Sequence, residues 1–195
     1  KNPVKIMSAK KYPAGGDWER MIIKSAQVAE INHLHLEHSN YGINVVNSKA
    51  LIKKSLLRKN KFRGVLAVNS DVFIEDSEVS MGHQVAVHAD AYSNVNITRS
   101  RFHRNKIANV VMPYGSLMLR NSLIEKNHKG LLLLDSVSLE VFNSKIRNNQ
   151  VGLASNTTLF NLKDSDKGIL GDMSSVEGVF NNDRNFLKIP KNIVE

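Results

Sequence analysis

The chain has 195 residues, and its Lys and Arg residues exceed its Asp and Glu residues by 27 − 18 = 9. This length suffices for one sizeable domain or two small ones, and the cationic excess favours anionic partners such as acidic polysaccharides, nucleic acids or anionic lipids. No run of about 18 apolar residues occurs, which argues against membrane insertion as a helix. The absence of cysteine excludes disulfide bonds and cysteine-ligated zinc.

The first 27 residues precede the regular part of the sequence. We expect residues 1–27 to form an entry coil that caps one end of the fold, because a repetitive fold exposes its core at both ends. This segment contains the tripeptide Gly16-Asp17-Trp18.

The next segment, "INHLHLEHSN", is rich in histidine. If Leu34 and Leu36 point inward, strand alternation places His33 and His35 on the outer side together. Two imidazoles on one strand, with His38 at the following turn, could ligate zinc. The alternative is that these three histidines are solvated beside the first complete coil.

A serine then recurs at intervals of 22, 23, 22 and 22 residues. These serines are Ser55, Ser77, Ser100, Ser122 and Ser144. An apolar residue stands three positions before each serine and another two positions after it. An asparagine follows four of the serines by five positions, namely Asn60, Asn105, Asn127 and Asn149, with Gly82 as the exception. Such a fixed period is typical of a repeat protein.

Each repeat contains three short strand patterns separated by Ser, Asn and Gly, and none has helical periodicity. The sequence therefore predicts an all-β solenoid with three parallel strands per coil, about 22 residues per coil and roughly seven coils. Equivalent residues would stack about 4.8 Å apart. The aliphatic columns would form the core, and the asparagine column would be a structural stack of amides.

The repeated "NSxI…N…G[IVL]" unit resembles the right-handed parallel β-helix family, whose fold is that of pectate lyases and related carbohydrate-active proteins. The Gly16-Asp17-Trp18 tripeptide is similar to the first coil of many such domains. We expect the β-helix to span residues 1–170, and residues 171–195 to form an irregular last coil or a C-terminal cap or tail. The resemblance implies an extracellular, cell-surface or periplasmic location.

The catalytic signatures of that family are absent from the sequence. It has no Asp-Asp pair, no Gly-His-Gly and no Asp-Pro-His, and coils of 22 or 23 residues leave little room for the loops that would wall off an active site. We therefore expect no catalytic residues and no cofactor. The alternative is a polysaccharide lyase or uronate epimerase that uses cationic side chains alone.

Basic residues recur next to the serine column on the expected outer surface. They would form a basic stripe made of Arg58, Lys59, Arg101, His103, Arg104, Lys126 and Arg147. A stripe with a repeat of about 4.8 Å suits an extended anionic polymer. The alternative is that Lys and Arg occupy these positions because strand surfaces are solvated.

A second outer surface is expected to be apolar. The predicted inward column of its strands is Ile43, Val65, Val85, Val110, Leu131 and Leu153. The predicted outward apolar residues include Val46, Val68, Val111, Leu132 and Leu134. An exposed apolar patch usually marks an interface, so we expect another protein domain, another chain or the C-terminal tail to cover it. The alternative is that sheet surfaces tolerate aliphatic residues.

Taken together, the sequence predicts a non-catalytic scaffold or binding module that engages an acidic polysaccharide or a partner protein. It has few aromatic residues to stack on bases and no recognition helix, so we expect no nucleic-acid binding.

Overall fold

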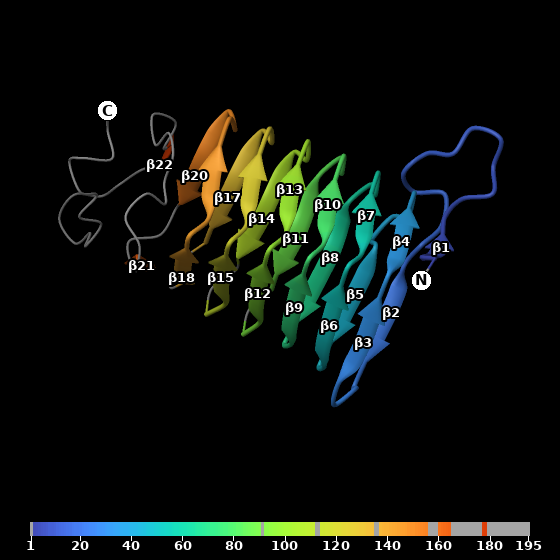
Figure 1. Ribbon diagram of the computed structural model, residues 1–195, viewed down its shortest axis with the longest axis horizontal. Helices are drawn as coiled ribbons and strands as arrows, with labels where there is room; N and C mark the ends of the chain where they lie inside the picture. The colour runs from blue at the N-terminus through green and yellow to red at the C-terminus, as the bar shows by residue number, and fades with distance from the viewer. Residues whose placement is uncertain are drawn as a thin grey trace.

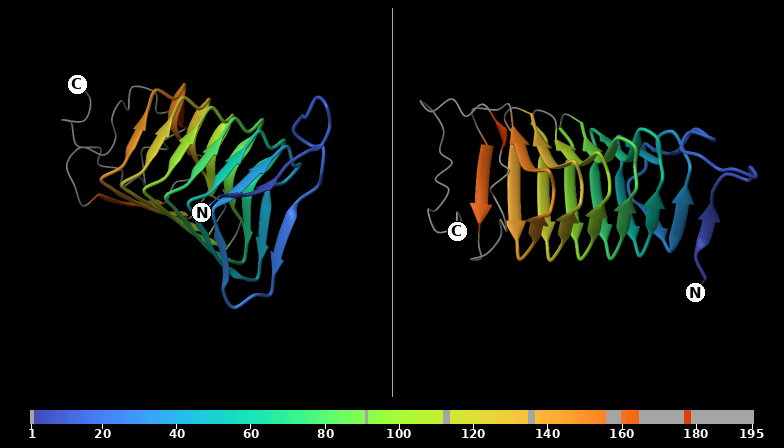
Figure 2. Two further views of the ribbon diagram at one scale, coloured as in Figure 1. Left: turned by 45° about the vertical axis from the view of Figure 1, so that its right-hand side comes forward. Right: turned by 90° about the horizontal axis from the view of Figure 1, so that it is seen from above.

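The computed structural model describes residues 2–90, 92–111, 114–134, 137–155, 160–164 and 177–178. Its regular elements in these ranges are β-strands, which wind into a parallel solenoid (Figure 1). Figure 2 shows the same stack of coils from two other sides. The predicted all-β class, the three strands per coil and the period of about 22 residues are confirmed. The solenoid has about six turns, against the roughly seven expected, and most of the last predicted coil lies outside the described residues.

Three parallel sheets form the walls of the solenoid. Sheet I contains β1 (Val4–Ile6), β4 (Leu34–Glu37), β7 (Leu56–Arg58), β10 (Glu78–Ser80), β13 (Arg101–His103), β16 (Leu123–Glu125) and β19 (Lys145–Arg147). Sheet II contains β2 (Met21–Lys24), β5 (Ile43–Val46), β8 (Arg63–Val68), β11 (Val85–Ala89), β14 (Ile107–Val111), β17 (Lys129–Leu133), β20 (Val151–Ser155) and β22 (Glu177–Gly178). Sheet III contains β3 (Ala29–Asn32), β6 (Lys49–Lys53), β9 (Asp71–Glu75), β12 (Asn94–Thr98), β15 (Ser116–Arg120), β18 (Val137–Phe142) and β21 (Phe160–Asp164).

The core consists of aliphatic columns that run along the solenoid. In sheet I the central residue of each short strand is buried and pairs in register with its equivalents in the neighbouring coils, as Leu57 does with Val79 and Val79 with Phe102. In sheet III the corresponding column includes Ile52, Ile74 and Ile97. Both columns were predicted from their spacing around the serines, and both are confirmed.

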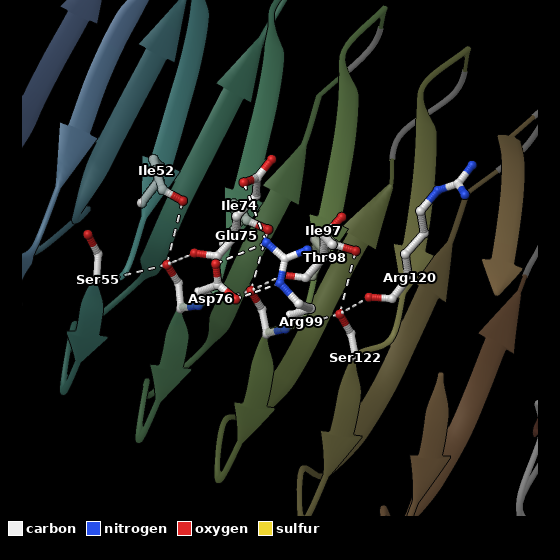
Figure 3. A network of polar contacts seen from close by, with 12 residues as sticks. Ile52, Ser55, Ile74, Glu75, Asp76, Ile97, Thr98, Arg99, Arg120 and Ser122 are labelled. Carbon is white, nitrogen blue, oxygen red and sulfur yellow. Dashed lines mark hydrogen bonds and ion pairs between the residues drawn. The ribbon is translucent and has the colours of Figure 1, made fainter. Parts of the chain in front are cut away.

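The repeated serines form a hydrogen-bond ladder at the corner between sheets III and I (Figure 3). The backbone N–H of Ser55 donates to Ser77 Oγ at 3.0 Å, and Ser77 N–H donates in turn to Ser100 Oγ at 3.1 Å. Each hydroxyl also donates to the carbonyl two residues before it, as Ser122 Oγ does to the oxygen of Arg120 at 2.8 Å. A second serine ladder at the corner between sheets II and III links Ser48 to Ser70. These corners turn without leaving buried N–H groups unpaired.

The asparagines form the third ladder, at the corner between sheets I and II. Asn127 Oδ1 accepts from the backbone N–H of Asn105 at 2.9 Å and from its Nδ2 at 3.1 Å. Asn127 Nδ2 donates to the carbonyls of Phe102 and Glu125 and to Asn149 Oδ1. The structural role predicted for this column is confirmed, since the buried amide satisfies its neighbours in the coils on both sides.

The inward column predicted for sheet II is wrong at two positions. Ile43 and Val65 are followed by Val87 instead of Val85, and then by Asn109 instead of Val110. The equivalent inward positions of sheet II stand 22 residues apart from Ile43 to Leu153, and the predicted Val85 and Val110 depart from this interval. Leu131 and Leu153 are placed inward as predicted.

The register of sheet II places an amide in the core. Asn109 is 1% exposed between the aliphatic neighbours Val87 and Leu131. Within the described residues neither its Oδ1 nor its Nδ2 has a hydrogen-bond partner. An unpaired buried amide opposes folding, so Asn109 is a local weak point in the stack.

The same substitution should therefore change the free energy of unfolding in opposite directions at the two buried asparagines. Asn109→Val should raise the free energy of unfolding by about 1–2 kcal/mol, because it removes an unpaired amide. Asn127→Val should lower it by about 2–3 kcal/mol, because it leaves the buried N–H of Asn105 without an acceptor. Denaturant midpoints of the two variants and of the wild type measure both effects. A loss of stability in both variants would contradict the placement of Asn109.

The first coil is closed by the segment before β2. Trp18 Nε1 donates to the carbonyl of Glu37 at 2.7 Å, and the amides of Gly16 and Asp17 donate to the carbonyl of His38 at 3.0 and 2.9 Å. Ion pairing with Lys10 holds the pKa of Asp17 well below its usual range. This part of the 1–27 segment lies over the corner between sheets I and II. The segment predicted as the C-terminal cap or tail, residues 171–195, lies outside the described residues apart from 177–178.

Candidate functional site: the charged face of sheet I

The outer face of sheet I carries two columns of side chains. Because the middle residue of each three-residue strand is inward, the residues on either side of it are outward. The first outward column contains His35, Leu56, Glu78, Arg101, Leu123 and Lys145. The second contains Glu37, Arg58, Ser80, His103, Glu125 and Arg147. Five of the seven residues of the predicted basic stripe lie on this face or at its edge and contact carboxylates.

The first carboxylate is Glu37, which is 3% exposed. It pairs with Arg58 of the next coil and with His35 on its own strand. Its Oε2 lies 3.6 Å from Lys59 Nζ and 3.4 Å from His38 Nε2. Burial opposes the charge of Glu37, but the hydrogen bonds from Arg58 and His35 and the attraction of Lys59 outweigh it, so the pKa of Glu37 is lowered.

The second carboxylate, Glu78, is half-buried and lies two coils further along. Its Oε1 is 3.0 Å from His103 Nε2 and accepts a hydrogen bond from Ser80 Oγ at 2.8 Å. Burial acts against ionisation, yet these contacts and the charge of Arg101 leave the pKa of Glu78 lowered. His103 is itself buried, so its imidazole belongs to the interior of this network.

The third carboxylate, Glu125, bridges two coils. It is 3% exposed and pairs with Arg101 on one side and with Arg147 on the other, the latter through Nε at 3.2 Å. Burial opposes the ionisation of Glu125, but the hydrogen bonds and the attraction of the two guanidinium groups outweigh it. The pKa of Glu125 is therefore lowered. The two arginines hold a buried anion between them from the coils on either side, and 47% and 45% of their side chains are exposed.

Arg104 and Lys126 differ from the other predicted residues. Both are exposed and occupy the left-handed corner position directly after sheet I, with φ of 57° and 56°. In the part of the chain that the structure describes, neither side chain makes an ion pair or hydrogen bond. These two cations therefore face solvent at the edge of the charged face.

The predicted stripe is thus a mixed-charge surface. Its six Lys and Arg residues stand over three glutamates, which leaves 6 − 3 = +3 with His103 neutral. Sequence reasoning counted the cations by column and did not consider Glu37, Glu78 or Glu125 as their ion-pair partners. The register could have shown this pairing, because each glutamate occupies the same outward columns as the arginines.

The three histidines of the predicted zinc site lie on β4 and at the corners on either side of it. Leu34 and Leu36 are buried, as expected. His33 occupies the corner before β4 with φ of 57°, whereas His35 and His38 both contact Glu37. No group of three or more His, Asp or Glu side chains suited to a metal ion occurs among the described residues.

A shallow groove of about 750 Å³ runs beside the charged face, along the corner between sheets III and I. Leu56 and Leu123 form apolar parts of its lining, and Arg101 and Arg99 contribute cations. Arg99 pairs through Nε and a terminal nitrogen with both oxygens of Asp76, at 2.7 and 3.0 Å (Figure 3). Sequence reasoning missed this groove because its lining comes from corners and strands of several coils.

The predicted apolar surface lies on sheet II. Val46, Val68, Leu132 and Leu134 are half-buried. Val111 pairs with Ala89 and Leu133 of the neighbouring coils, and its side chain lies outside what the structure describes. His88 interrupts the surface, and Arg63 Nε donates to its Nδ1 at 3.1 Å. Burial lowers the pKa of His88.

The architecture and the stacked polar corners define the chain as a parallel β-solenoid. A scan against family models matches the right handed beta helix region over residues 21–165, and the chain belongs to this family. The comparisons with curated proteins and with solved structures found no match. Within the described residues, no helix is long and apolar enough to cross a membrane.

The buried carboxylates predict how stability depends on pH. The pKa of Glu125 is lowered by folding, so its contribution is complete above the ordinary Glu pKa of about 4.3 and is lost as the pH falls through the folded value. We expect Glu125→Gln to lower the free energy of unfolding by about 1–2 kcal/mol at neutral pH, since its partners are partly solvated. This difference from wild type should shrink near pH 3, because the carboxyl of the unfolded chain is protonated there and the stabilisation from ionised Glu125 is partly lost.

Denaturant midpoints measured at both pH values test this, with Glu30→Gln as the matched control. Glu30 is exposed on β3, and its variant should stay close to wild type throughout. A destabilisation by Glu125→Gln that is equal at both pH values would show that packing, and not charge, accounts for the effect.

Proposed function

We propose that the chain is a rigid, non-catalytic β-helix scaffold that binds an acidic polysaccharide along the charged face of sheet I. The observation that carries this proposal is the pair of exposed cations, Arg104 and Lys126, beside arginines whose outer edges are also exposed. An extended polyanion that follows the solenoid would meet a cation in successive coils, about 4.8 Å apart. An extracellular, cell-surface or periplasmic location would bring the chain to such polymers.

The buried glutamates support this proposal in spite of their charge. Glu125 lies beneath Arg101 and Arg147 and holds both guanidinium groups in place, so little side-chain entropy remains to be lost when a ligand binds. Each guanidinium has five N–H donors, and the contacts to Glu125 use only some of them. The remaining donors are available to carboxylate or sulfate groups.

The competing function is that of a polysaccharide lyase or uronate epimerase. The contact of His103 with Glu78 beside Arg101 favours it, because a carboxylate can orient an imidazole base next to a guanidinium that neutralises a uronate. Against it, His103 is buried, and a base must reach the proton that it removes. The surroundings of the face are also open, which weakens electrostatic catalysis.

A partner protein is the other predicted ligand, and sheet II is where it would bind. The half-buried residues Val46, Val68, Leu132 and Leu134 supply the apolar part of this surface. It is interrupted by His88 and Arg63, and the charged face of sheet I is the better-supported site.

The double variant Arg104→Ala, Lys126→Ala tests the proposal. We expect its affinity for polygalacturonate, alginate or heparin to fall roughly tenfold at low salt, and the salt dependence of the remaining binding to be weaker. Affinity electrophoresis at several NaCl concentrations measures both quantities.

The matched control is Lys11→Ala, Lys24→Ala, which removes the same charge from the first loop and from β2. It should bind like wild type. Equal weakening in both double variants would mean that net charge alone attracts the polymer. Shortened polyuronate chains after incubation with the wild-type protein would establish the lyase instead, and His103→Gln would then be the next variant to assay.

A further inference from the structure

The corner between sheets II and III contains a column of residues in the left-handed backbone region. Asn47, Asn69, Tyr92 and Tyr114 occupy it in successive coils, with φ of 47°, 46°, 59° and 62°. Their equivalence follows from the register of the strands that start two residues later. Asparagine tolerates this conformation well, whereas a bulky aromatic residue does so rarely. Tyr92 and Tyr114 therefore depart, in two successive coils, from the asparagine that this position holds in the preceding coils.

Stability does not explain the two tyrosines. Their rings stack with centroids 5.4 Å apart and planes 9° from parallel, but Tyr92 is 65% exposed and Tyr114 is 63% exposed. They bury little surface in return for an unfavourable backbone conformation. An exposed, stacked aromatic pair at a corner that holds asparagine in the two preceding coils points to a function.

A pocket of about 330 Å³ lies next to Tyr92. Tyr114 stacks on Tyr92 from the following coil, so the other side of Tyr92 is turned toward the coil of Asn69. Asn47, Asn69, Lys49 and Asp71 also line this pocket. The pocket thus has one aromatic wall and several polar ones.

The polar groups of the pocket are only partly engaged. Asn69 Nδ2 donates to Asn47 Oδ1 at 3.0 Å, which leaves Asn47 Nδ2 as a donor and Asn69 Oδ1 as an acceptor. Asp71 accepts from Asn94 Nδ2 through Oδ1 and has a second oxygen. Lys49 Nζ lies 5.1 Å from the ring centre of Phe73. With one cation and one anion, the pocket has no net charge.

We propose that this corner is a binding site for a neutral sugar, with a pyranose ring stacked on the open side of Tyr92. The weakly positive C–H face of a sugar ring suits the negative face of an aromatic ring. Its hydroxyl groups, which both donate and accept, suit the mixture of amide and carboxylate groups beside it. Tyr114 holds the ring of Tyr92 in place from the opposite side.

This site is separate from the proposed polyanion surface. The corner joins sheets II and III, and sheet I forms the wall of the solenoid opposite to it (Figure 2). Its ligand is uncharged, so its affinity should survive salt concentrations that screen sheet I.

The test compares Tyr92→Asn and Tyr114→Asn with the wild type. Asparagine is the residue that the column holds in the two preceding coils, so both variants should fold. The probes are neutral hexasaccharides of glucose, mannose, galactose and xylose, studied by calorimetry and by saturation transfer to the sugar C–H protons. At about 1 M NaCl, where exposed charges are screened within about 3 Å, we expect the wild type to bind one of them. Tyr92→Asn should weaken this binding roughly tenfold or more.

The matched control is Tyr12→Asn, since Tyr12 is an exposed tyrosine in the first loop and should not affect the binding. Tyr114→Asn should have an intermediate effect, because it removes only the support of the stacked ring.

The proposal is overturned if the wild type binds none of the four hexasaccharides at millimolar concentration, or if Tyr92→Asn binds as well as the wild type. It is also overturned if the Arg104→Ala, Lys126→Ala variant loses the same binding, since that would place the sugar on sheet I. Polyanion binding by Tyr92→Asn should be unchanged, so the two sites succeed or fail independently.

Discussion

At its corners each coil has backbone N–H groups that find no hydrogen-bond acceptor in its own strands. A side chain of the following coil accepts hydrogen bonds from them. The hydroxyl of Ser77 does this for Ser55, and the amide oxygen of Asn127 does it for Asn105. The acceptor must stand one full turn further along the chain, so it recurs every 22 or 23 residues. This constraint explains why the period is strict and why short polar residues occupy the corners. The aliphatic core depends on it, because only coils in register bring equivalent side chains into stacked columns.

The same register organises the charges on the outer surface. In a solenoid with about 4.8 Å between coils, a carboxylate on one strand lies within ion-pairing distance of a cation on the next. Glu37 and Arg58 meet in this way, as do Glu125 and its two arginines. Burial alone would favour the neutral acid, yet the paired cations keep each carboxylate ionised. The surface that results is ordered before any ligand arrives, which distinguishes it from a set of solvated lysines.

The structure shows which parts of the fold a sequence can predict. The asparagine column repeats one residue type at a fixed interval, so spacing alone was enough to predict its stack, whereas the serines were used only to find the period and their ladder was not predicted. The position of Asn109 was missed because the neighbouring Val110 suits an apolar column better than an amide does, although Asn109 keeps the 22-residue interval from Val87 to Leu131. The groups around Glu37 and Glu125 were partly visible, since their columns were known, but sequence reasoning weighed the cations without their partners. The pairing of Tyr92 with Tyr114 was not visible, because two tyrosines 22 residues apart do not form a pattern until their corner position is known.

A solenoid separates its core from its surface more fully than a globular domain does, because each coil contacts only its neighbours. Inward and corner residues must conform to the column above and below, but outward residues can change over two or three coils without disturbing the rest. The corner between sheets II and III illustrates this, since it changes from asparagine to tyrosine while the serine ladder beneath it continues from Ser48 to Ser70 and Ser93. The charged groups of sheet I form patches of similar length on another wall. A rod built in this way can hold chemically different surfaces on different sides, each fixed in position by the same hydrogen-bonded corners.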